Sequence, residues 1–284
     1  MGPNSQVRSL RTIPSSLRTI SWEEDGVRLH PWPEDPECSG LVVRFAKNSS
    51  LPLTALASFP GSGNTWLRYL VQGASGIFTG SIYGNQDLAT GGFPGEVRDH
   101  TDGSTILQKT HCHFICHIDN HVDMFGGRAI VIIRNPYKAI LSYWNLITTH
   151  SQSNIANETR FQTKTFRAFV ISEAAGWLDV IEFWTKFGKN LYFVAYEDLC
   201  KDPIEEIRKI LRHLNIAEQE DRLHCVRKNL EGNFFFRRTG QQHVNPFTED
   251  HHVIMRTVIM KAAKLVNKFN FSLPTDKYQF YNSN

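Results

Sequence analysis

The sequence has no apolar run long enough to cross a bilayer. A membrane-spanning helix needs about 20 consecutive apolar residues, and no stretch of this chain reaches about 18. Residues 1–32 are polar and rich in Arg, Ser and Pro, and they contain no apolar core of the kind that signal peptides have. We therefore expect no membrane-spanning segment in this chain.

Cysteine and net charge are also scarce. Five scattered cysteines do not form a disulfide framework, although Cys200 and Cys225 are a candidate pair in a secretory compartment. Cys112 and Cys116 have histidines beside them, but a Cys-x3-Cys pair without a second distant pair is poor for structural zinc, so no metal is expected. The formal net charge of +3 is too small to indicate nucleic acid as the main partner.

The nucleotide-triphosphatase loop, Gly-x-x-x-x-Gly-Lys-Ser/Thr, is absent because no lysine follows Gly63. A different glycine-rich loop is present. The apolar run 51–59 ends at a Pro-Gly-Ser-Gly-Asn turn, and an amphipathic stretch, 65–73, follows. A strand, a tight loop and a helix in this order aim backbone N–H groups and the positive end of a helix dipole at one point, where a phosphate or sulfate binds. The binders predicted here are Gly61, Ser62, Gly63, Asn64 and Thr65.

From residue 51 onward, short apolar strands alternate with amphipathic helices. This alternation predicts an α/β fold of the P-loop-like, three-layer type, with a central parallel sheet flanked by helices. The expected strands are 53–59, 104–109, 129–134 and 191–196, and the expected helices are 65–75, 136–148, 163–187, 203–214, 219–230 and 249–267. Residues 76–103 are predicted to be a long loop that covers a substrate. Residues 1–50 lack periodicity and are expected to be a flexible N-terminal arm or a wrap over the domain formed by 51–284.

Four segments, in order, resemble the signature of the sulfotransferases that use 3′-phosphoadenylyl sulfate. They are Pro-Gly-Ser-Gly-Asn-Thr-Trp at 60–66, Lys-Thr-His at 109–111, Arg-Asn-Pro at 134–136 with a serine at 142, and Tyr-Glu-Asp at 196–198. Over about Leu51 to Gly240, the amino-acid sequence is most similar to the catalytic domain of the WSC-domain-containing sulfotransferases.

This resemblance implies transfer of a sulfuryl group from 3′-phosphoadenylyl sulfate, without a metal, to a glycan or other hydroxyl acceptor, with a sialylated glycan as the acceptor in the most similar members of the family. It also implies a membrane-held protein of the Golgi. The membrane helix of such proteins is not in this chain, so a truncated form and a cytoplasmic address are the alternatives. Three glycosylation sequons, at Asn48, Asn157 and Asn270, give weak support to a luminal glycoprotein.

His111 and Lys109 are the predicted catalytic residues. His111 follows a strand end, where α/β folds place ligands, and a histidine takes up protons near neutral pH. Lys109 lies two residues earlier, so both side chains leave the same face of the strand, and its ammonium can neutralise charge on the transferring group.

The remaining predicted site residues follow from the resemblance. Arg134 and Ser142 match the binders of the 3′-phosphate, and Arg237 or Arg238 matches a basic turn that closes on the same group. Two aromatic residues match positions beside the adenine base. These are Trp66 and Tyr196.

One position departs from the common pattern of the cytosolic sulfotransferases, which carry lysine where this chain has Gly61. Arg68, one helical turn further on, either compensates for the missing cation or is a solvated helix residue. The departure keeps two alternatives open: a non-catalytic interaction module with the same fold and, less favoured, a nucleoside or nucleotide kinase.

Overall fold

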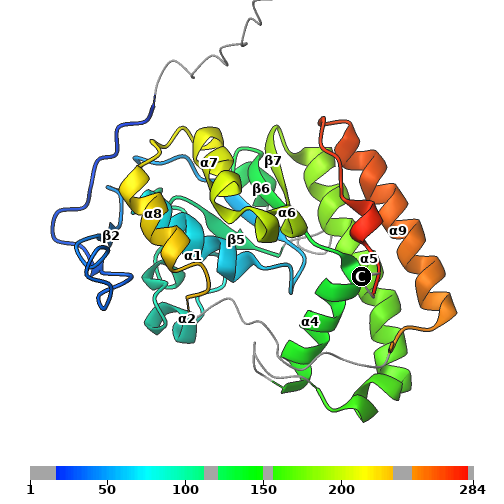
Figure 1. Cartoon of the computed structure of the whole chain (residues 1–284). Helices are drawn as coiled ribbons and strands as arrows, with labels where there is room; N and C mark the ends of the chain where they lie inside the picture. Colours follow the sequence, from blue (N-terminus) through cyan, green and yellow to red (C-terminus); the bar gives the residue numbers. More distant parts are fainter. Residues whose placement is uncertain (1–16, 112–120, 150–155, 233–244, 281–284) are drawn as a thin grey trace, which may run out of the picture.

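A five-stranded parallel sheet forms the centre of the molecule (Figure 1). The structure is a computed structural model that describes residues 17–111, 121–149, 156–232 and 245–280. In spatial order the strands are β4 (Gly80–Ser81), β5 (Gln108–Thr110), β3 (Ala55–Ser58), β6 (Arg128–Ile133) and β7 (Asn190–Ala195). This arrangement confirms the predicted α/β class with a parallel sheet.

Helices cover both faces of the sheet (Figure 1). One face carries α1 (Asn64–Ser75), α7 (Pro203–His213) and α8 (Glu220–Lys228). The other carries α4 (Pro136–Thr149), α5 (Lys164–Phe187) and α9 (Glu249–Asn267). The shorter elements are the antiparallel pair β1 (Arg28–Leu29) and β2 (Val43–Arg44), helices α2 (Gln86–Thr90), α3 (His121–Met124) and α6 (Tyr196–Lys201), and 3-10 turns at Pro94–Glu96, Glu158–Gln162 and Thr275–Lys277.

The apolar strands form because both of their faces are buried. In β6, Ala129 and Val131 pack into the core beneath α4, α5 and α9, whereas Ile130 and Ile132 pack into the core beneath α1, α7 and α8. Successive side chains of a strand point to opposite faces, so a strand covered on both sides reads as a continuous apolar run. That run is what makes the central strands predictable.

Sequence patterns located the central strands and the long helices to within a few residues. The strand expected at 191–196 ends one residue early, because Tyr196 begins α6. The region 76–103, expected as a single loop, contains β4, α2 and a 3-10 turn. These elements are too short to show a hydrophobic period, and β4 is a two-residue edge strand.

Residues 17–50 lie against α1 and α8. Cys38 forms a disulfide with Cys225 of α8, so the candidate pair Cys200 and Cys225 does not form, and Cys200 is a free, exposed thiol. The indole N–H of Trp32 donates to the Tyr69 hydroxyl at 2.8 Å in the same contact. The bonded cysteines are 187 residues apart, and only the packing of this segment brings them together. The domain boundary at residue 50 stays a prediction.

No helix within the described ranges combines the length and the apolarity that crossing a membrane requires.

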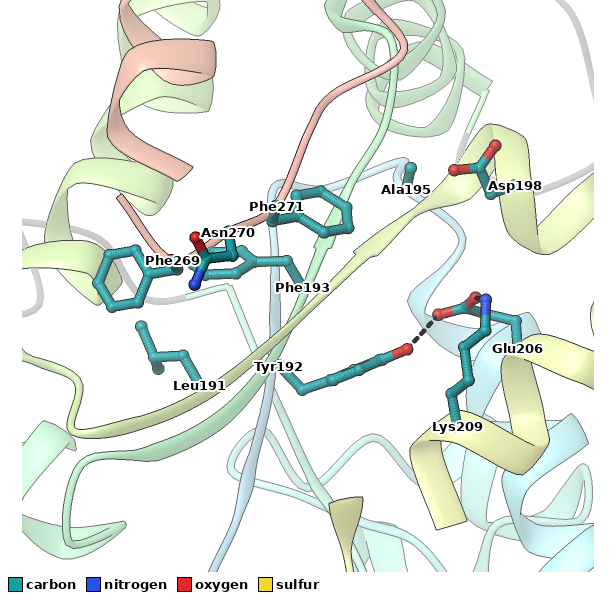
Figure 2. A pocket seen from close by; sticks show the side chains of 10 residues that line it. All are labelled: Leu191, Tyr192, Phe193, Ala195, Asp198, Glu206, Lys209, Phe269, Asn270 and Phe271. Atoms are coloured by element: carbon teal, nitrogen blue, oxygen red, sulfur yellow. Dashed lines mark hydrogen bonds and ion pairs between the residues drawn. The ribbon is translucent and has the colours of Figure 1, made fainter. Parts of the chain in front are cut away.

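A cavity of about 290 Å³ lies at the outer edge of β7, where the Tyr192 hydroxyl donates to Glu206 (Figure 2). None of the residues that line it is a predicted site residue. All three sequon asparagines are exposed, and Asn270 lines this cavity.

Candidate active site

The glycine-rich loop joins the end of β3 to the start of α1. Gly61 and Gly63 have φ angles of +76° and +88°, a region that favours glycine. A Cβ on Gly61 would lie 2.5 Å from the carbonyl oxygen of Ala139, and one on Gly63 would lie 2.4 Å from the Tyr196 ring. Gly63 is the N-cap of α1 and offers no side-chain acceptor to the first turn. The loop therefore leaves the positive end of the helix open for an anion.

Two polar side chains of the loop are buried. The hydroxyl of Ser62, which is 1% exposed, has no hydrogen-bond partner among the described residues. Asn64 donates from its amide to the Leu56 carbonyl at 3.0 Å and to the Ser58 hydroxyl at 3.1 Å. Asn64 thus fixes the loop on the end of β3. The Ser62 hydroxyl is buried and unpaired among the described residues, and such a group usually has a hydrogen-bond partner, which a bound ligand would supply.

His111 lies directly past the end of β5, beside the end of β3. The register pairs Thr110 with Ala57, so His111 follows alongside Ser58. The His111 ring nitrogen Nδ1 is 2.8 Å from the Ser58 carbonyl oxygen, which can only accept. Nδ1 therefore carries the proton, and Nε2 keeps a free lone pair that can receive one.

Tyr83, from the region between α1 and β5, completes this corner. Its hydroxyl accepts from the His111 backbone N–H at 2.6 Å, and its ring stacks on the imidazole with centroids 5.7 Å apart. The Lys109 ammonium lies 5.8 Å from the centre of the same ring. The structure therefore brings Lys109 and His111 to one place, as their spacing on the strand predicted.

Burial and a neighbouring positive charge shift both catalytic candidates toward their neutral forms. Burial, followed by the charge of Arg68, lowers the pKa of Lys109 to about 8. Burial, followed by the charge of Lys109, lowers the pKa of His111 to about 3. The imidazole is thus neutral near pH 7, which is the state that a base requires.

Arg68 plays neither of the two roles expected from the sequence. It is fully buried, and it forms an ion pair with Glu96, which is also buried. Its Nε donates to the Thr79 hydroxyl at 3.1 Å, and the guanidinium stacks on Phe93 at 4.5 Å. Arg68 therefore anchors the region 76–103 to α1 and acts on Lys109 only through its charge.

The phosphate-clamp candidates meet at Gly61. Arg134 donates from Nη1 to the Gly61 carbonyl at 2.6 Å, and its guanidinium stacks on the Tyr196 ring at 4.4 Å. Ser142, on α4, borders the same loop, since a Cβ on Gly61 would be 3.0 Å from its Cβ. Trp66 lies edge-on to Tyr196 and is 4% exposed, so its stacking on adenine stays a prediction.

Two predictions fall outside the described part of the chain. Arg237 and Arg238 lie outside it, as do the cysteines and histidines of 112–117. Within the described ranges, no three His, Cys, Asp or Glu side chains converge as metal ligands would.

Sequence reasoning missed three residues that shape the site. Tyr83 and Glu96 lie in the region expected as a loop, and the sequence indicates Ser58 only as part of a strand. A single tyrosine within the glycine-rich stretch 80–84 was a usable signal for Tyr83. Nothing in the sequence indicates that Glu96 pairs with Arg68, because the pair is 28 residues apart and depends on the tertiary fold.

Comparison with known proteins identifies the family. A sulfotransferase-domain family model matches residues 103–253. The chain is 36% identical over 235 residues to a WSCD family member of Drosophila pseudoobscura, covering 79% of this chain and 68% of that protein. It is 35% identical over 222 residues to a WSCD family member of Drosophila melanogaster, covering 76% and 66%. The chain belongs to the sulfotransferase family and, within it, to the WSCD family.

A solved structure agrees on the fold. Mouse sulfotransferase SULT7A1, complexed with PAP, superimposes with a TM-score of 0.52 at 18% identity, covering 77% of this chain and 88% of that one. This likeness shows the fold alone. The chain spans about two thirds of the length of its WSCD relatives.

Proposed function

We propose that this protein transfers the sulfuryl group of 3′-phosphoadenylyl sulfate to a hydroxyl of a glycan, with a sialylated glycan as the acceptor. The observation that carries the proposal is the position of His111 and Lys109 at the end of β5, beside the end of β3, from which the uncapped loop leads into α1. Mouse sulfotransferase SULT7A1, which has the same fold, is complexed with PAP, and this supports the choice of nucleotide.

The residues present fit such a nucleotide. The loop cradles an anion with backbone groups at Gly61 and Gly63, where a side chain would clash. The unpartnered hydroxyl of Ser62 supplies a buried donor at the same place. Arg134 supplies a guanidinium fork beside Gly61, where a second phosphate would be held.

His111 acts as the base. In sulfuryl transfer the acceptor oxygen bonds to sulfur, the bond from sulfur to the nucleotide phosphate breaks, and the hydroxyl proton must be removed. His111 receives this proton on Nε2, because Nδ1–H is held by the Ser58 carbonyl. Its low pKa in the free protein rises when a polyanionic nucleotide offsets the charge of Lys109, which brings the base closer to its best range.

Lys109 and the loop supply the positive charge that, in the common family pattern, comes from a lysine at the position of Gly61. The Lys109 ammonium is largely buried, so its field is weakly screened by water. The backbone N–H groups at the start of α1 add a fixed dipole of the same sign. Together they stabilise the negative charge that develops on the sulfuryl group and on the leaving phosphate.

Two observations support the acceptor and the compartment. The Tyr83 ring is 49% exposed and adjoins His111, so it offers a flat apolar surface on which a sugar ring can pack. The Cys38–Cys225 disulfide is typical of proteins that mature in an oxidising compartment, which favours the Golgi lumen over the cytoplasm.

Two measurements test the proposal. Calorimetry should show that adenosine 3′,5′-bisphosphate binds and that ATP competes poorly; preference for ATP would instead indicate a kinase. Transfer of labelled sulfate to a panel of glycans should then identify the acceptor. Binding of the bisphosphate without transfer to any hydroxyl acceptor would indicate a non-catalytic module of the same fold.

We expect Arg134→Ala to weaken binding of adenosine 3′,5′-bisphosphate by about 1.5–3 kcal/mol, because a charge-assisted fork is lost. Ser142→Ala should cost less, since only one neutral donor is removed. Titration calorimetry gives both values. Equal binding of adenosine 5′-phosphate and the bisphosphate by the unchanged protein would show that no 3′-phosphate site exists.

Lys109 should set the alkaline limit of the reaction. Its ammonium is the active form and its pKa is about 8 in the free protein, so kcat/KM should fall as pH rises through that value. A bound polyanion favours the ammonium, so the same limb of kcat should lie at higher pH. Arginine stays charged, so Lys109→Arg should be slower but lose this limb, while Lys109→Ala should be nearly as slow as a variant without His111. An unchanged alkaline limb in Lys109→Arg would assign the titration to another group.

A further inference from the structure

Asn135 is a fully buried polar residue between Arg134 and the first turn of α4. Its amide nitrogen donates to two backbone carbonyls of the C-terminal segment, Thr275–Phe280. These are the carbonyls of Lys277, at 3.2 Å, and Gln279, at 2.9 Å. Its amide oxygen accepts from the Tyr137 N–H at 3.0 Å and so caps α4. Both ends of this side chain are therefore used, and one end reaches a segment more than 140 residues away in the sequence.

Three side chains of the C-terminal segment contact the rest of the protein at this place. Tyr278 is 4% exposed, and burial followed by the neighbouring Glu197 carboxylate raises the pKa of its hydroxyl. Glu197 is the same residue whose Oε1 accepts from the Asn135 backbone N–H at 2.9 Å. Lys277 lies 3.9 Å from Asp198, and Phe280 packs on Phe247 with ring centroids 5.4 Å apart.

These contacts fix the peptide that carries Arg134 from three sides. The Arg134 carbonyl accepts from the indole of Trp177 at 3.0 Å, and the next N–H is held by Glu197. The side chain of Asn135, the residue that follows Arg134, donates to two carbonyls of the C-terminal segment. From this backbone position the Arg134 guanidinium reaches the Gly61 carbonyl and the Tyr196 ring. A displacement of the guanidinium by about 1 Å is enough to weaken its bidentate contact with a phosphate.

We propose that the C-terminal segment, Thr275–Phe280, acts through Asn135 to position Arg134 for the 3′-phosphate, which makes this segment a determinant of nucleotide specificity. The inference rests on the proposed function, because it assumes that Arg134 contacts the 3′-phosphate. Asn135 is a positioning residue here and does not touch the nucleotide. The contribution of the 3′-phosphate to binding should therefore depend on residues at the far end of the chain.

The experiment compares the affinities for adenosine 3′,5′-bisphosphate and adenosine 5′-phosphate by calorimetry in full-length variants, together with the unfolding temperature of each. In Asn135→Ser the shorter side chain still caps α4 but does not reach the two carbonyls. We expect its affinity for the bisphosphate to fall about tenfold, while that for the monophosphate changes less than about twofold. A chain that ends at Pro274 should show the same selective loss.

Asn145→Ser is the matched control. Asn145 is also buried, at 2%, and also lies on α4, but its side-chain oxygen accepts from the backbone N–H of Ala156 and not from the Arg134 turn. This variant should unfold at a lower temperature with an unchanged ratio of the two affinities. If Asn135→Ser and the shortened chain behave like Asn145→Ser, losing stability without losing the ratio, the positioning role is wrong. If the unchanged protein does not prefer the bisphosphate, the proposed function itself fails.

Discussion

Replacing His111 by alanine should lower turnover by about 10²-fold or more and leave the affinity for adenosine 3′,5′-bisphosphate nearly intact. The reason is that His111 supplies a lone pair on Nε2 and holds itself in place through Nδ1, without belonging to the phosphate-binding loop. Single-turnover rates with saturating nucleotide measure the first effect, and calorimetry measures the second.

His111→Asn gives the sharper version of this test. An asparagine amide can keep the hydrogen bond to the Ser58 carbonyl, but it has no basic nitrogen, so this variant should be as slow as the alanine variant. His30→Ala, at an exposed histidine, is the matched control and should react normally. Turnover near that of the unchanged protein in His111→Asn would mean that the histidine only positions the strand end.

The acid side of the pH profile should follow from the same residue. Burial keeps the pKa of His111 at about 3, so its neutral form persists well below the usual titration range of histidine. We therefore expect no loss of kcat/KM as pH falls from 7.5 to about 6, where an ordinary histidine with a pKa near 6.5 would already be largely protonated.

Gly61→Lys should abolish nucleotide binding, even though it restores the cation that the common family pattern carries at this position. Gly61 has a φ of +76°, and a Cβ there would lie 2.5 Å from the Ala139 carbonyl oxygen, which belongs to the backbone of α4, so one of the two must shift. Strain of about 1–3 kcal/mol from the backbone angle adds to this clash. The loop would have to shift, and its anion-binding N–H groups would shift with it.

A matched control separates the clash from the backbone angle. Gly126 also has a positive φ, of +57°, but nothing lies within 4 Å of a Cβ built there. Gly126→Lys should therefore cost only some stability and leave binding of the bisphosphate unchanged. Binding by Gly61→Lys at the level of the unchanged protein would show that this position faces away from the nucleotide. Partial rescue of Lys109→Ala by Gly61→Lys would show that the loop relaxes and that the new ammonium reaches the leaving phosphate.

A site residue could be predicted where its conformation is determined by its neighbours in the sequence. The glycine loop, the strand-end pair Lys109 and His111, and the Arg134 turn are each encoded in a few consecutive residues, because strands, tight loops and helix starts have short-range rules. The structure brings these segments to the same end of the sheet, since parallel strands end at a common edge. Their assigned chemical roles stay predictions.

By itself the sequence determined the α/β class, the central strands and the segments that carry the chemistry, because apolar periodicity and turn residues report local conformation and burial. Only the tertiary structure decided the partners of Arg68, Cys225 and Asn135. Arg68 is buried against Glu96, Cys225 is bonded to Cys38, and Asn135 is tied to the C-terminal segment. Each of these contacts joins residues far apart in the chain, and a buried charge, thiol or amide takes whichever partner packing places beside it.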